Sequence, residues 1–158
     1  ALTCLVAMTL AYMSLRRGRP TWHWTPTTRL ASAVVAGLYL LHVSGIAVAG
    51  PGSFTGVLGW PRSVHNGQDV LGAVQVMRAL LAFVLVVALG LLARRSWNVP
   101  GLSTPARVLV AALVVEAISV ALIANSGAEM WFTLFFCGAA TAILSAATVI
   151  AGRSALDA

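Results

Sequence analysis

The sequence predicts an all-α integral membrane protein, with residues 1–158 forming a single transmembrane domain, and three observations lead to this fold class. Composition is the first, because 59% of the residues are hydrophobic, only 9% are charged and the mean hydropathy is +0.92, whereas soluble domains carry about 25% charged residues. The second is the length of the apolar segments, most of which run to about 20 residues, enough to cross a hydrocarbon core of about 30 Å. The third is that all ten basic residues are arginines, which gather in alternate connections.

Five apolar segments are predicted to be the transmembrane helices. They are residues 1–15, 30–49, 70–93, 107–124 and 130–151. The last four form a four-helix bundle and the first precedes it, which gives a five-transmembrane-helix bundle with antiparallel neighbours, because the connections are short. The longest connection, residues 50–69, is rich in glycine and proline, and such composition favours turns. We expect it to be an external loop.

The arginines predict the orientation of the chain. Those on one side are Arg16, Arg17, Arg19, Arg29, Arg94, Arg95, Arg107 and Arg153, and the opposite connections hold only Arg62. Arginines near helix ends stay on the cytoplasmic side, so the N-terminus is expected outside and the C-terminus in the cytoplasm, in a multi-pass protein of the cell (plasma) membrane. The predicted partner is therefore the lipid bilayer. Nucleic acid is excluded as a partner, since no basic patch with interleaved aromatic residues is present.

Three polar residues lie within the apolar segments, at a cost of a few kcal/mol each unless they are paired or face water. Counted from the outer ends of their helices, His42, Arg78 and Glu116 are all about 10–12 Å deep at a rise of about 1.5 Å per residue. Gln75 precedes Arg78 by three residues and shares its helix face. The simplest interpretation is an intramembrane ion pair of Arg78 with Glu116, surrounded by His42 and Gln75. The alternative is a site for a cofactor propionate, a quinone or another polar group.

Small residues predict close contacts between the membrane helices. Gly37 in the second predicted helix and Gly138 in the fifth would let neighbouring backbones approach, as is usual where hydrophobicity does not drive helices together. No soluble-enzyme motif, metal site or catalytic residue is recognisable, because the chain has no lysine for a phosphate loop and only four acidic residues. Whether the chain is an enzyme is left open by the residues.

Several stretches of this layout resemble the C-terminal half of the haem A synthase family, especially its actinobacterial members. Residues 45–52 (GIAVAGPG) are similar to the glycine-rich exit of the helix that opens the second bundle of that family. Residues 74–79 (VQVMRA) and 135–140 (FFCGAA) are similar to the regions around its two haem-ligating histidines, and Glu116 falls where some members carry a glutamate. The resemblance covers nearly the whole chain in layout and implies the last five of eight helices.

The resemblance also implies a haem site with altered ligands. Met77 and Phe135 stand where the family has its two histidines, and phenylalanine cannot coordinate iron, whereas methionine can serve as an axial ligand opposite a histidine. With His42 at a similar depth to Met77, the implied cofactor-binding residues are His42, Met77, Gln75 and Arg78, and the implied cofactor is haem.

Three functional hypotheses follow. The first is a haem A synthase-like membrane protein associated with haem handling or cytochrome oxidase biogenesis. Under this hypothesis the bundle either binds haem or is degenerate and haem-free. Its expected partner is a missing N-terminal bundle. A non-catalytic transmembrane subunit of a larger respiratory or other membrane complex is the second, with other membrane subunits as partners. The third is half of a small transporter or channel, for which no inverted repeat or broken-helix pair is recognisable.

Overall fold

Four long helices make up the part of the chain that the computed structural model describes, residues 23–49, 70–126 and 130–156. The helices are α2 (Pro26–Ala49), α5 (Val70–Ser96), α6 (Ser103–Ser126) and α7 (Met130–Leu156), and these residues contain no strand. Three helices contain segments long and apolar enough to cross a membrane, namely Val76–Ser96, Ser103–Ile123 and Leu134–Leu156. The described part of the chain is therefore all-α, with three helices suited to a membrane protein. The predicted helix over residues 1–15 and the predicted external loop over residues 50–69 lie outside the described residues.

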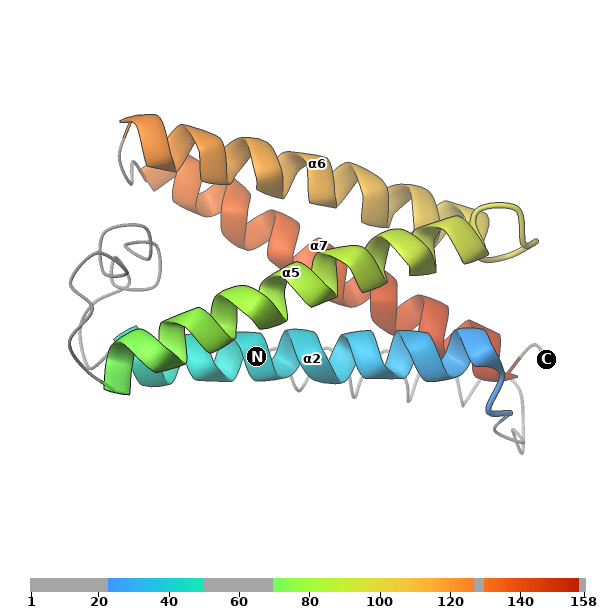
Figure 1. Ribbon diagram of the computed structural model, residues 1–158. Helices are drawn as coiled ribbons and strands as arrows, with labels where there is room; N and C mark the ends of the chain where they lie inside the picture. The colour runs from blue at the N-terminus through green and yellow to red at the C-terminus, as the bar shows by residue number, and fades with distance from the viewer. Residues whose placement is uncertain (1–22, 50–69, 127–129, 157–158) are drawn as a thin grey trace.

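The four helices form a closed ring of neighbours. Helix α2 packs against α5 and α7, and α6 packs against the same two helices. Figure 1 shows α2 and α6 running in one direction and α5 and α7 in the other, with α5 crossing over α7. Successive described helices are thus antiparallel, so the ends of α5 and α7 lie beside the starts of α2 and α6.

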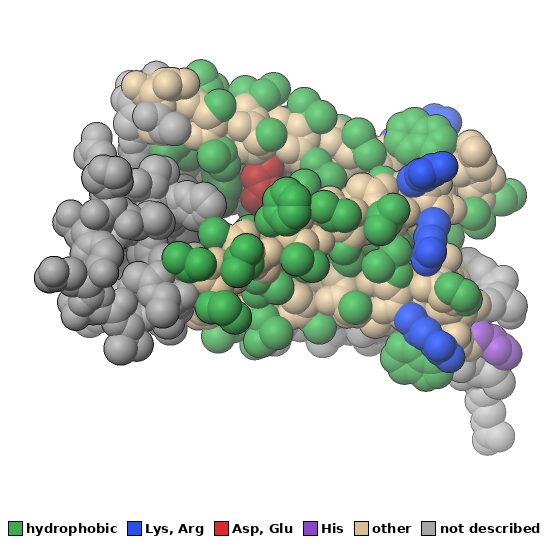
Figure 2. All heavy atoms as spheres, in the orientation of Figure 1, with side chains coloured by type: hydrophobic (Ala, Val, Ile, Leu, Met, Phe, Trp, Pro, Cys, Tyr) green, Lys and Arg blue, Asp and Glu red, His purple; other side chains and the backbone are tan. Residues whose placement is uncertain are grey.

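The exposed arginines of the described residues lie at the end of the bundle where α5 and α7 end and α2 and α6 begin. We call it the arginine end. They are Arg29, Arg94, Arg95, Arg107 and Arg153, and Figure 2 shows basic side chains gathered there. Most of the buried side chains lie in the half of the bundle next to it. Examples are Val34, Leu38, Leu85, Leu89, Leu92, Leu109, Ile143, Leu144, Ala147 and Ile150. The other half, which we call the distal half, is less closely packed in the described residues.

The helices extend beyond the apolar segments at the arginine end because local interactions stabilise these turns. Helix α2 begins at Pro26 rather than residue 30, since Oγ1 of Thr25 accepts a hydrogen bond from the backbone N–H of Thr28 at 3.1 Å, as an N-cap does. The hydroxyl of Thr28 in turn donates to Oγ of Ser154 at 3.1 Å, and both residues are buried. This interhelical hydrogen bond joins the start of α2 to the end of α7.

The connection from α5 to α6 is fixed by a glycine and an arginine. Gly101 has a φ of +81°, a conformation that side chains other than glycine rarely adopt. Its carbonyl accepts a hydrogen bond from Nη1 of Arg153 near the end of α7. Three helices therefore converge on this turn.

Candidate intramembrane polar site

The three intramembrane polar residues continue the inward faces of their helices into the distal half. Residues three, four or seven positions apart lie on one face of a helix. Pairs with these spacings are Leu38 with His42, Leu85 with Arg78, and Ala112 with Glu116, and the apolar member of each pair is buried. The polar member of each pair is part-buried. All three polar side chains therefore start from positions that face the bundle rather than the lipid.

A close contact between α2 and α5 shows that His42 and Arg78 lie near one level of the membrane. A Cβ atom added to Gly37 would lie only 2.6 Å from Cδ2 of Leu85, so these two residues oppose each other across the interface. Counting away from this contact along antiparallel helices places Arg78 within about two residues, or about 3 Å, of the level of His42.

The imidazole of His42 is held by its own helix. Its Nδ1 lies 2.7 Å from the carbonyl oxygen of Leu38. Because a carbonyl can only accept a hydrogen bond, Nδ1 carries the hydrogen, and Nε2 of the neutral ring keeps its lone pair. This arrangement resembles that of histidines that bind metals, whose second nitrogen usually donates to a backbone carbonyl or a carboxylate.

Glu116 lies close enough to His42 for the two groups to interact electrostatically. His42 is the described residue that acts electrostatically on the carboxyl group of Glu116. Figure 2 shows acidic side-chain atoms, coloured red, between α5 and α6 in the distal half, and Glu116 is the only Asp or Glu among the described residues. His42 and Glu116 therefore lie in the same half of the bundle.

Arg78 is in a different environment; no ion pair joins it to Glu116 among the described residues, and the pair that the sequence suggested stays a prediction. Its Nε atom is buried without a hydrogen-bond partner in the described part of the chain. The reason is the direction of the α5 face. Arg78 is two helical turns from Leu85, which contacts Gly37, so it projects from the side of α5 that faces α2.

The two residues at the positions of the family's histidines point away from the bundle. Met77 is 67% exposed and Phe135 is 61% exposed. Each neighbours a residue on the inward side, Arg78 and Phe136 respectively, and successive residues of a helix are rotated by about 100°. The side chain of Gln75 lies outside the described residues.

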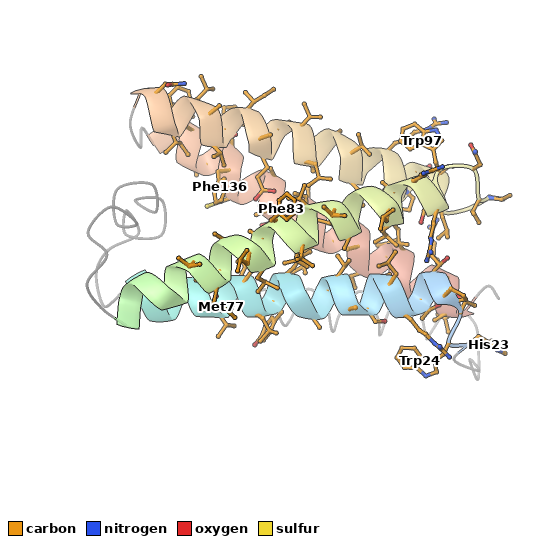
Figure 3. All side chains as sticks on the ribbon, in the orientation of Figure 1. His23, Trp24, Met77, Phe83, Trp97 and Phe136 are labelled. Carbon is orange, nitrogen blue, oxygen red and sulfur yellow. The ribbon has the colours of Figure 1, made fainter. Side chains whose placement is uncertain are left out.

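Phe136 is a site residue that the sequence interpretation missed. It is part-buried and lies in the distal half, as does Met77 (Figure 3). Its spacing of four residues from the buried Ala140 is the signal that could have placed it on the inward face of α7. It adds an aromatic surface to the half of the bundle that contains His42 and Glu116.

The site thus consists of a fixed imidazole beside a carboxyl group, a guanidinium group with an unsatisfied buried nitrogen, and a phenyl ring. Such a set can bind a polar or partly aromatic ligand. The described residues contain no group of three or more His, Cys, Asp and Glu residues able to hold a metal ion. No protein-family model, curated protein or solved structure matches this chain.

Proposed function

We propose that this chain is a haem A synthase-like membrane protein that handles haem, in association with cytochrome oxidase biogenesis, and that His42 is its axial ligand. The observation that carries the proposal is the hydrogen bond from Nδ1 of His42 to the carbonyl of Leu38. It fixes the ring and leaves Nε2 as the nitrogen able to bind iron. The similarity of residues 45–52, 74–79 and 135–140 to the family supports the haem A synthase-like part of the proposal, while His42 as the ligand rests on the geometry alone.

Arg78 supplies the second support for a haem. A haem carries propionate groups, and an arginine binds a carboxylate through strong charge-assisted hydrogen bonds. The buried Nε of Arg78 has no partner in the described residues and lies near the level of His42, so a propionate would satisfy it. The exposure of Met77 and Phe135 argues against either as a second ligand of the haem iron. His42 would then be the one residue of the protein that binds the iron. A haem held there would contribute a redox-active iron. Gln75 remains a proposed cofactor-binding residue beside Arg78.

The proposed topology completes the assignment. Five transmembrane helices, with residues 1–15 as the first, place the N-terminus outside and the C-terminus in the cytoplasm of a plasma-membrane protein. The exposed arginines at one end of the bundle support this orientation, because they would stay in the cytoplasm. The haem would then be bound from the outer side of the membrane.

An absorption spectrum tests the haem proposal. Purified protein supplied with haem should show a Soret band and an α band on reduction, and His42→Ala should abolish both. The matched controls are His23→Ala, which alters an exposed histidine at the arginine end, and His65→Ala in the 50–69 connection. Both control variants should keep the haem spectrum. Arg78→Gln should weaken haem binding about tenfold, the usual effect of losing a hydrogen bond to a charged group. A spectrum unchanged in His42→Ala would refute the proposed ligand.

A second candidate function is a non-catalytic transmembrane subunit of a larger respiratory or other membrane complex. It is favoured by the apolar surface of α5, which is exposed on more than one face. Exposed large side chains of this helix are Val76, Met77, Leu80, Phe83, Val84, Val86, Val87 and Leu91. Lipid or the helices of another subunit would cover them. Absence of any haem spectrum, together with co-purification of a stoichiometric membrane partner, would support this function over the first.

A further inference from the structure

The arginine end carries far more positive than negative charge. Its five exposed arginines come from the starts of α2 and α6 and from the ends of α5 and α7. Glu116, the only acidic residue described, lies in the distal half instead. The printed sequence adds Arg16, Arg17 and Arg19 just before the described residues and a single carboxylate, Asp157, just after them. An excess of this size attracts anionic groups.

Two tryptophans lie beside these arginines. Trp24 is 58% exposed before the start of α2, and Trp97 is 42% exposed after the end of α5. Figure 3 shows both at the same end of the bundle, Trp97 beside α6 and Trp24 beside α2. The guanidinium carbon of Arg107 lies 5.9 Å from the centre of a Trp97 ring, within the range of a cation–π interaction. Exposed tryptophans at the ends of membrane helices lie at the level of the lipid headgroups.

Register brings Arg29 and Arg94 to one level. The contact of Gly37 with Leu85 fixes the alignment of antiparallel α2 and α5, and counting eight residues from it toward the arginine end reaches Arg29 on α2 and Ala93 on α5. Arg94 directly follows Ala93, so the two arginines lie at one level of the bundle, on neighbouring helix ends. Both are exposed, and neither makes an ion pair in the described part of the chain.

We propose that Arg29, Arg94 and Arg95, between Trp24 and Trp97, form a binding site for the headgroup of an anionic phospholipid. Guanidinium groups bind phosphate oxygens in a bidentate manner, and the tryptophans keep the site in the headgroup layer, where lipid phosphates are concentrated. The other two arginines of this end are already engaged, Arg107 with Trp97 and Arg153 with the carbonyl of Gly101. A lipid headgroup bound by these arginines would bridge the neighbouring ends of α2 and α5. This proposal is independent of haem.

Native mass spectrometry of the full chain in a neutral detergent tests the site. Phosphatidylglycerol, which is anionic, should bind at least about tenfold more tightly than zwitterionic phosphatidylcholine with the same acyl chains. Each of Arg29→Gln and Arg94→Gln should weaken phosphatidylglycerol binding about fivefold, the usual contribution of one arginine near an anionic surface. The matched control Arg62→Gln, which removes the same charge from the opposite connection, should leave it within about twofold.

Two outcomes would overturn the proposal. One is equal binding of the two lipids by the unaltered protein, a measurement that needs no variant to fold. The other is an equal loss of phosphatidylglycerol binding in Arg62→Gln and in the two site variants, since that would indicate attraction by total charge alone.

Discussion

His42 and Glu116 share one half of the bundle, and their interaction depends on the faces from which they project. The carboxyl group is near the imidazole, while the guanidinium group of Arg78 projects from the side of α5 that faces α2. A charged group inside a membrane is costly unless another group compensates for it. Compensation for Glu116 therefore comes from His42, and Arg78 is left for a ligand or a lipid.

Double-mutant cycles on detergent-purified protein should reveal this difference. His42→Gln combined with Glu116→Gln should show a coupling free energy of at least about 0.5 kcal/mol, as expected for interacting residues. Arg78→Gln combined with Glu116→Gln should be additive within about 0.5 kcal/mol, as expected for residues that share no contact. The free energy of unfolding of each variant supplies the measurement. A large coupling of Arg78 with Glu116, and none with His42, would restore the ion pair first suggested by the sequence.

The cost of polar groups in lipid identified these three residues from the sequence, but not their pairing. The depth of each residue in the membrane can be predicted from the sequence, by counting residues from the end of its helix. The direction of a side chain around its helix depends on which neighbour each face meets, and the low amphipathicity of apolar membrane helices hides that information. Arg78 illustrates this, because only the contact of Leu85 with Gly37 shows that its face belongs to α2. The outward directions of Met77 and Phe135 could not be predicted from the sequence either, because the low amphipathicity of their helices does not show which face meets a neighbour.

At the scale of the helix pair, one glycine sets how closely α2 approaches α5. Sequence suggested that both Gly37 and Gly138 permit close packing, since each lies in an apolar helix. Only Gly37 does so, because a Cβ there would lie 2.6 Å from Cδ2 of Leu85, whereas a Cβ on Gly138 would meet nothing within 4 Å. Small residues in membrane helices thus have different roles according to the face on which they lie.

Substitutions at these glycines should therefore have opposite effects on stability. Gly37→Val should destabilise the protein by about 1–3 kcal/mol through overpacking, and Leu85→Ala in the same chain should recover part of that loss. The matched controls Gly138→Ala and Gly90→Ala, at positions with open space, should be neutral or stabilising by up to about 1 kcal/mol, because alanine is the better helix former. Thermal unfolding in detergent measures all of them. Equal destabilisation at Gly37 and Gly138 would contradict the assigned interface.

Across the whole molecule, aromatic and basic side chains are distributed as in a protein that spans a membrane. On α7, Trp131 is exposed near the distal start of the helix and Arg153 is exposed near its other end. The separation of these residues along the helix axis is about 33 Å at 1.5 Å per residue, close to the thickness of a hydrocarbon core. The exposed arginines of the described residues lie at one end, the distribution from which the positive-inside rule predicts a direction in the membrane.

Labelling of single cysteines in cells tests that direction. In a background with Cys4→Ala and Cys137→Ala, Asn98→Cys places a thiol in the exposed turn after α5, and Gly67→Cys places one in the connection of residues 50–69. A membrane-impermeant maleimide should label Gly67→Cys in intact cells, and Asn98→Cys only after permeabilisation, because the positive-inside rule predicts that the arginine end stays in the cytoplasm. The reverse pattern would move the lipid site to the outer leaflet and make the site of His42 accessible from the cytoplasm. Labelling of both thiols in intact cells would contradict a membrane span by α5 itself, since that helix separates the two positions.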